Sequence, residues 1–284
     1  MNTEERQRPE TIDFLIYIKK RLDDLVIGET GKIDIRKGRE TDPEQPDERG
    51  ILNGTETITV KINGGARNSV KGGKERHKAF PNVWSPKDKQ REIDMMSLID
   101  QLFDEHGVEY ILIYGSLLGC IRHGGQIPWD SDIDITVNRD HLDRLKKVLH
   151  VLEEEHDYRW LEEVTPGNGE YHKVFPTSGT KQRYYRWPFV DIFSYTTTDT
   201  EIDFHSNGPA LAPLEPFAKE SFFPLDRREF EGMMISVPAK PKVFLNQHYP
   251  RWDTTCVNFD RNDHSLTMGS MTVDELRPFH KFII

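Results

Sequence analysis

Hydrophobic and polar positions follow two different periods along the chain, and these periods predict its helices and strands. Apolar residues recur at helical spacing from Ile93 to Phe103, after a Ser85-Pro86 pair that is a typical helix start. A second helix is expected from Asn138 to about Glu155, because Asn is a favourable N-cap and Leu and Val follow on one side. Strands are predicted where β-branched and aromatic residues gather, at residues 108–114, 132–137, 158–163, 171–175 and 188–195.

This order of elements predicts an α/β (α+β) domain in which helices flank a mixed β-sheet. The first part of the chain differs, since residues 36–49 hold nine charged residues and two prolines. We expect residues 1–84 to be an irregular, partly flexible extension, with a short strand near 57–62 and an amphipathic helix near 12–26. Residues 85–252 are predicted to form the main domain, and residues 253–284 a C-terminal tail that packs on its core.

Composition narrows the classes of function. The chain has 284 residues and a formal net charge of −10, which disfavours nucleic acid as a partner. Its longest run without Asp, Glu, Lys or Arg, residues 110–121, is shorter than the roughly 20 residues that a membrane span needs, so we expect no transmembrane segment. Two cysteines provide no disulfide framework, and the first twenty residues do not resemble a signal peptide. These features favour a cytoplasmic protein, or a lumenal one if a leader precedes this sequence.

The most informative motif is a set of alternating acids, Asp130, Asp132 and Asp134. On a strand, alternate side chains share a face about 6.6 Å apart, so these carboxylates should repel one another unless solvent screens them or a divalent cation binds them. A calcium loop beginning at Asp130 is a rival explanation, but it requires Gly where Ile135 stands and Glu where His141 stands. The motif therefore favours a metal site built on a strand.

A fourth acid, Asp191, lies in an apolar stretch, and burying it unpaired would be costly. Gly115 and Ser116 follow a predicted strand and could offer backbone N–H groups and a hydroxyl to a phosphate. A glycine-serine turn, alternating acids and a distant acid among apolar residues are together typical of a nucleotidyltransferase palm, where Mg²⁺ ions join carboxylates and phosphates. Candidate cations for the same pocket are Arg122, His123, Arg183 and Arg186.

At these residues the sequence resembles the LicD family, which includes bacterial phosphocholine transferases and the animal fukutin and fukutin-related proteins. The resemblance is carried by the motif Tyr114 to Gly119, by Arg122-His123-Gly124, by Ile127 to Asp134, and by Val190 to Phe193. It extends over roughly residues 85–252. It implies a nucleotidyltransferase-like fold and transfer of a phospho-alcohol, such as phosphocholine or a polyol phosphate, from a CDP-activated donor to a glycan or glycolipid hydroxyl, with release of CMP.

The resemblance also implies roles for the motif residues. Asp132 and Asp134 correspond to a pair of ligands for Mg²⁺ or Mn²⁺, and Asp130 to a third ligand or a supporting acid. Asp191 corresponds to the remaining carboxylate, which could also accept the proton of the acceptor hydroxyl. The donor phosphate would be held by Gly115, Ser116, Arg122, His123 and Arg183.

Two other functions remain open from the sequence. One is a nucleotidyltransferase that adds a nucleotide to a small molecule or a nucleic acid, although the acidic balance disfavours the latter. The other is a non-catalytic nucleotide-binding relative. The presence of all four acids argues against this second function.

Overall fold

The computed structural model divides the chain into two compact units, one formed by residues 1–80 and 255–272, the other by residues 81–254 and 273–284. The second unit carries all the predicted site residues that the structure describes. The predicted helix near residues 12–26 and the cation Arg183 lie outside the described residues. The structure describes residues 34–38, 57–61, 77, 80–165, 169–182, 184–204, 216–249, 251–260 and 265–284.

The second unit is built on a mixed sheet to which, among the described residues, seven strands contribute. Its centre is the parallel pair β4 and β9, and the other pairings of this sheet are antiparallel. Along the sheet the order is β11-β10-β9-β4-β3. In addition, β5 pairs with β6, and β6 pairs with β9. The strands are β3 (Tyr110–Leu112), β4 (Ile133–Asn138), β5 (Tyr158–Thr165), β6 (Gly169–Pro176), β9 (Val190–Thr197), β10 (Glu201–Asp203) and β11 (Phe217–Ala218).

The alternating pattern of residues 132–137 produces the predicted strand, β4. Ile133, Ile135 and Val137 are at most 1% exposed, and Asp134 between them is only half-buried. The apolar residues of β9 are also buried, as expected for a central strand covered on both faces. The prediction of a mixed sheet flanked by helices is confirmed.

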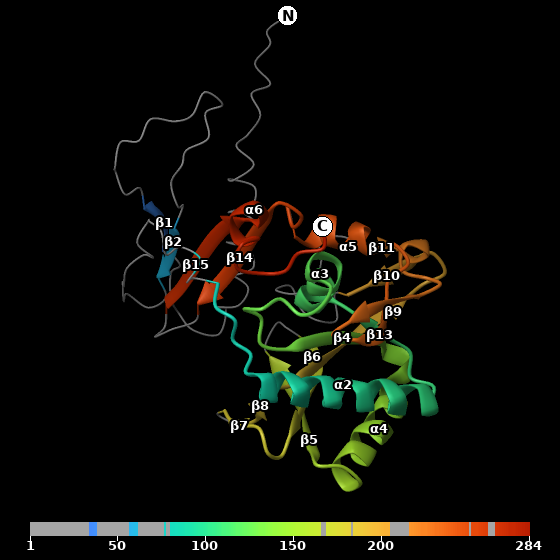
Figure 1. Ribbon diagram of the computed structural model, residues 1–284. Helices are drawn as coiled ribbons and strands as arrows, with labels where there is room; N and C mark the ends of the chain where they lie inside the picture. Colours follow the sequence, from blue (N-terminus) through green and yellow to red (C-terminus); the bar gives the residue numbers. More distant parts are fainter. Residues whose placement is uncertain are drawn as a thin grey trace, which may run out of the picture. The chain divides into compact units, whose positions relative to one another are not determined.

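Helices cover both faces of this sheet (Figure 1), with α2 and α4 on one side and α3 on the other. The predicted start of α2 is confirmed, because Ser85 accepts a hydrogen bond from the Asp88 backbone N–H and Pro86 is the first helical residue. Asn138 caps a short 3₁₀ helix, Arg139–His141, that leads into α4. The helices are α2 (Pro86–Glu105), α3 (Tyr114–His123), α4 (Leu142–Glu154), α5 (Pro241–His248) and α6 (Val273–Leu276).

The boundary between β3 and α3 differs from the prediction. The strand ends at Leu112, and Tyr114 already begins the helix with φ 49°. A non-glycine residue at positive φ is uncommon and marks a tight junction between strand and helix. The tight turn brings the first turn of α3 next to β4, whose Asp134 carbonyl accepts a hydrogen bond of 3.1 Å from the Ile113 N–H.

The C-terminal part of the second unit packs on α3. The Ile283 N–H donates to the Arg122 carbonyl at 2.9 Å, and the Phe282 ring lies 4.4 Å from the His123 ring, between centroids. Two-stranded pairs complete this unit. They are β7 (Thr180–Lys181) with β8 (Arg186–Trp187) and β12 (Asp226–Phe230) with β13 (Met233–Val237), and a second 3₁₀ helix spans Lys219–Ser221.

The first unit contains an antiparallel sheet of order β1-β2-β15-β14. The strand predicted near residues 57–62 is confirmed as β2. Within the described residues, no helix of either unit is both long enough and apolar enough to cross a lipid bilayer. The strands of this sheet are β1 (Asp34–Gly38), β2 (Thr57–Lys61), β14 (Thr255–Asp260) and β15 (Ser265–Thr272).

Candidate active site

Three of the predicted acids meet at the centre of the sheet. Asp134 on β4 and Asp191 on β9 are direct partners in the parallel pairing, and Asp132 precedes β4 by one residue. One carboxylate oxygen from each of these three residues lies within 4.8 Å of the others. Asp132 and Asp134 are half-buried and Asp191 is 7% exposed. Carboxylate oxygens gathered in this way are the donor set that Mg²⁺ and Mn²⁺ prefer, so the residues fit a divalent cation.

The electrostatics of this cluster favour a cation. The pKa of Asp134 is raised well above its ordinary value, chiefly by burial and then by the negative charges of Asp132, Asp130 and Asp191. The nearby ammonium of Lys173 opposes this shift. A bound divalent ion would relieve the same repulsion.

Gly115, at the start of α3, lies against the cluster. A Cβ atom at this position would overlap Oδ2 of Asp130 and would lie 3.8 Å from Oδ2 of Asp134. A side chain at this position would have to displace the Asp130 carboxylate, so glycine lets the first turn of the helix approach the acids in their present arrangement. The structure brings together Gly115 and the four predicted acids.

Ser116 lies between the first turn of α3 and β4. Its side chain is fully buried, and its hydroxyl oxygen accepts a hydrogen bond of 2.8 Å from the Asp134 backbone N–H. The role of Ser116 in holding a donor phosphate stays a prediction. Ser116 fixes α3 against β4 at the residue that carries a central carboxylate.

Arg122 and His123 are buried at the C-terminal end of α3, and their place in the phosphate pocket stays a prediction. They are 2% and 4% exposed and lie in the last turn of α3, away from its Gly115 end. The Arg122 guanidinium donates to the Trp252 carbonyl at 3.0 Å, and Nδ1 of His123 lies 2.8 Å from the Lys281 carbonyl. Burial, and then the charge of Arg122, lower the pKa of His123 to about 3. Both side chains therefore anchor C-terminal segments to α3.

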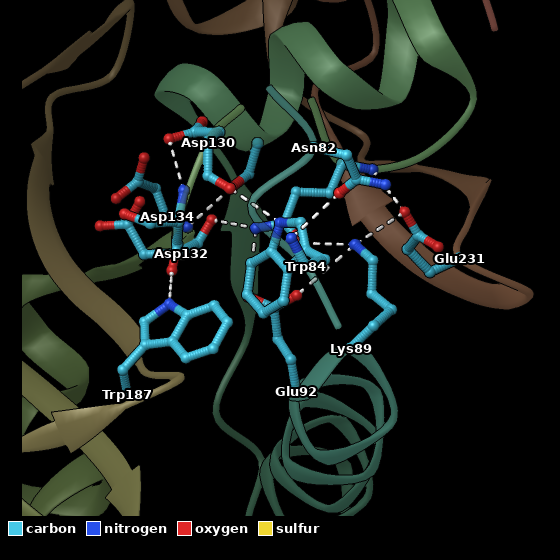
Figure 2. Close-up of polar contacts among 12 residues, drawn as sticks. Asn82, Trp84, Lys89, Glu92, Asp130, Asp132, Asp134, Trp187 and Glu231 are labelled. Carbon is cyan, nitrogen blue, oxygen red and sulfur yellow. Dashed lines mark hydrogen bonds and ion pairs between the residues drawn. The ribbon is translucent and has the colours of Figure 1, made fainter. Parts of the chain in front are cut away.

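Two tryptophans that the sequence did not single out as a pair hold the loop before β4. The Trp84 indole N–H donates to the Asp130 carbonyl at 2.8 Å, and the Trp187 indole N–H donates to the Ser131 carbonyl at 2.7 Å (Figure 2). The two rings pack on each other with centroids 4.7 Å apart. Since the loop carries Asp130 and Asp132, these contacts fix the backbone from which two acids project. Neither residue could be found from spacing, because they lie 103 positions apart.

A buried polar network supports the same loop from α2. Gln126 donates to the Asp132 carbonyl at 2.7 Å and to Glu92 at 3.1 Å, and Lys89 donates to the Gln126 side-chain oxygen at 2.7 Å and to Glu231 at 3.1 Å. Burial raises the pKa of Glu92, and the charge of Lys89 opposes that shift. Figure 2 shows Lys89 and Glu231 on the side of Trp84 opposite the acids. Beside this network lies a pocket of about 290 Å³, lined by Asn82, Trp84, Ser85, Pro86, Lys89, Gln126, Pro128 and Glu231.

Lys173 is a further residue that sequence reasoning missed. Its ammonium lies 2.6 Å from Oδ1 of Asp191, and its side chain is 5% exposed. The lysine comes from β6, which pairs antiparallel with β9. An isolated lysine in a strand gives no sequence signal of this contact.

The fold and the site define the class of protein: a mixed α/β domain whose central parallel strands carry a carboxylate cluster suited to a divalent cation. Residues 107–240 match the family described as LicD/FKTN/FKRP, nucleotidyltransferase domain. This match confirms the resemblance to the LicD family that the motifs predicted.

Curated relatives agree with this assignment. The chain is 32% identical over 116 residues to the lipopolysaccharide cholinephosphotransferase LicD of Haemophilus influenzae, covering 38% of this chain and 43% of that protein. It is 28% identical over 155 residues to the human ribitol 5-phosphate transferase FKRP, covering 51% of this chain and 30% of that protein. The chain thus spans less than half the length of these two relatives.

A solved structure, ANT(2")-Ia in complex with adenylyl-2"-tobramycin, superimposes on 52% of this chain and 68% of its own, with 15% identity and a TM-score of 0.34. A superposition at this level carries no functional argument. The family assignment rests on the sequence matches.

Proposed function

We propose that this domain transfers a phospho-alcohol, either phosphocholine or a polyol phosphate, from a CDP-activated donor to a hydroxyl of a glycan or glycolipid, with release of CMP. The observation that carries the proposal is the convergence of Asp132, Asp134 and Asp191 within 4.8 Å in a chain that matches the LicD family. Further support comes from the names of two relatives, a cholinephosphotransferase and a ribitol 5-phosphate transferase.

In this proposal the three clustered carboxylates hold Mg²⁺ or Mn²⁺, and Asp130 supports them from the preceding loop. A divalent ion at this position would neutralise the donor diphosphate and the charge that develops on the departing CMP. The protein's own contribution is to fix these carboxylates, through the Ser116 hydroxyl behind Asp134 and the tryptophan contacts to the loop.

The proposed reaction forms one bond and breaks one. The acceptor oxygen bonds to the phosphorus that bears the alcohol, and the bond from this phosphorus to the CMP oxygen breaks. CMP leaves with the electron pair, and the proton of the acceptor hydroxyl passes to a carboxylate of the cluster, for which Asp191 is our candidate. The backbone at Gly115 is the candidate contact for donor phosphate, since no side chain separates it from the acids.

A thermal-shift comparison tests the proposal. The purified protein is heated with Mg²⁺ and each of CDP-choline, CDP-ribitol, CDP-glycerol, CMP, CTP and ATP, in parallel with Asp132→Asn and a surface control, Asp199→Asn. We expect at least one CDP-alcohol to raise Tm in the wild type and the control but not in Asp132→Asn. Stabilisation by CTP or ATP alone would instead favour a nucleotidyltransferase. Magnesium binding without CMP release from any donor of this panel would favour a non-catalytic nucleotide-binding relative.

A further inference from the structure

A lysine completes a row of charged residues across three neighbouring strands. Asp134 on β4 is opposite Asp191 on β9, and Asp191 is in turn opposite Lys173 on β6. Residues that face one another across paired strands project from the same side of a sheet. The register therefore places one amino group at the end of a row of two carboxylates.

The environment of this amino group is closed and specific. Nζ of Lys173 lies 2.6 Å from Oδ1 of Asp191, 3.5 Å from the centroid of the Phe189 ring and 4.8 Å from that of Tyr185. Lys173 and Asp191 are 4% and 7% exposed. Aromatic faces and a carboxylate are the partners that allow an ammonium to remain charged when it is withdrawn from water. Lys173 is thus a buried part of the site and not a surface side chain that reaches over it.

We propose that Lys173 is the resident counter-cation of the carboxylate cluster, balancing one of its negative charges whether or not a divalent ion is bound. The ammonium offsets one negative charge of the ionised carboxylates, and a divalent ion would offset two more. The inference rests on the proposed function only in taking Asp132, Asp134 and Asp191 as the place where such an ion binds. Lys173 is a positioning residue, because it acts through Asp191.

This role predicts opposite effects on the empty and the metal-bound protein. Without Lys173 the empty cluster loses its compensating charge, so the folded protein is destabilised. The same loss removes a positive charge that repels an incoming cation, so the ion binds more tightly. A lysine that serves only to pack β6 against β9 would not produce the second effect.

The first experiment measures Tm in EDTA and in a Mn²⁺ titration, with Mn²⁺ affinity from calorimetry, for wild type, Lys173→Met and Lys173→Arg. Lys146→Met is the matched control, because Lys146 also pairs with a carboxylate, Glu162 at 3.1 Å, but is 40% exposed. We expect Lys173→Met to lower Tm in EDTA, to bind Mn²⁺ about tenfold more tightly, and to gain more Tm from Mn²⁺ than the wild type. Lys173→Arg and Lys146→Met should stay close to the wild type.

Where Mn²⁺ binds the wild type, unchanged or weaker Mn²⁺ binding by Lys173→Met would overturn the proposal, as would an unchanged Tm in EDTA. A second test does not depend on metal: in EDTA, the double variant Lys173→Met/Asp191→Asn should recover Tm relative to Lys173→Met, because the negative charge that Lys173 balanced is gone. The double variant also provides this test if Lys173→Met alone does not fold, since recovery is then seen as a folded protein. If Mn²⁺ does not change the Tm of the wild type but the double variant recovers its Tm, the metal site of the proposed function is refuted. The role of Lys173 as counter-cation then stands. Absence of recovery would refute the counter-cation itself.

Discussion

Replacing a central acid by its neutral isostere should make the metal-free protein more stable. In Asp134→Asn the side chain keeps its size and loses the charge that Asp132, Asp130 and Asp191 repel. The backbone contact to Ser116 is unaffected, since it uses the residue 134 N–H. We therefore expect a higher Tm in EDTA at neutral pH, together with loss of transferase activity.

The size of the effect follows from the separation of the acids. The three clustered carboxylate oxygens lie within 4.8 Å of one another, and two unit charges at that distance repel by about 3.5 kcal/mol at an effective dielectric constant near 20, or about 0.9 kcal/mol in water. Between these limits, we expect the free energy of unfolding of Asp134→Asn to exceed that of the wild type by about 2 kcal/mol. This gain corresponds to a rise in Tm of roughly 4–8 °C for a domain of this size.

The effect has a defined pH dependence. The pKa of Asp134 is raised in the folded protein, so the folded state binds this proton more readily than the unfolded state, and stability is lost as pH rises above the unfolded value of 3.8. The advantage of Asn should therefore be present at pH 7.5 and absent well below pH 3.8, where the acid is protonated in both states.

The assay is thermal unfolding followed by circular dichroism in EDTA at pH 7.5. Asp199→Asn is the control, because this exposed acid lies in the turn between β9 and β10, outside the cluster. Equal or lower stability of Asp134→Asn relative to the wild type would refute the electrostatic reasoning. Addition of Mn²⁺ should raise the Tm of the wild type more than that of the variant.

Three further predictions concern single residues. Trp187→Phe removes the indole donor to the Ser131 carbonyl and should weaken Mn²⁺ binding in calorimetry by about 1 kcal/mol while the protein stays folded. Gly115→Ala should displace the Asp130 carboxylate and lower both Mn²⁺ affinity and activity; unchanged values would refute the close approach. Burial lowers the pKa of His172 to about 4, so the free energy of unfolding should fall as pH drops from 6.5 to 4, and urea unfolding of His172→Gln should show a flatter dependence.

The fold and the acids of the site could be predicted because both depend on local pattern. Alternation of acids with Ile133, Ile135 and Val137 indicated a strand with carboxylates on one side; β4 is that strand, but it carries Asp134 alone, and Asp132 lies one residue before it. The apolar neighbours of Asp191 indicated a buried strand, which is β9. The parallel pairing of these two strands then brings the acids together.

The rest of the site depends on contacts between distant segments, which local pattern does not encode. The Lys173 contact requires one particular register of β6 on β9, and a slip of one residue would turn the lysine to the other face. His123 was expected to face the ligand because it is a potential donor next to a motif. Its ring meets a carbonyl 158 positions later in the chain.

The central claim, transfer of a phospho-alcohol from a CDP-activated donor, is tested most directly by ³¹P NMR of the reaction itself. The protein is incubated with Mg²⁺, a panel of oligosaccharide acceptors and CDP-choline, CDP-ribitol or CDP-glycerol, with CTP and ATP in separate tubes. The account predicts CMP and a new phosphodiester in equal amounts from one CDP-alcohol, and neither product with Asp134→Asn. Intact CDP-alcohols together with pyrophosphate released from CTP or ATP would contradict it.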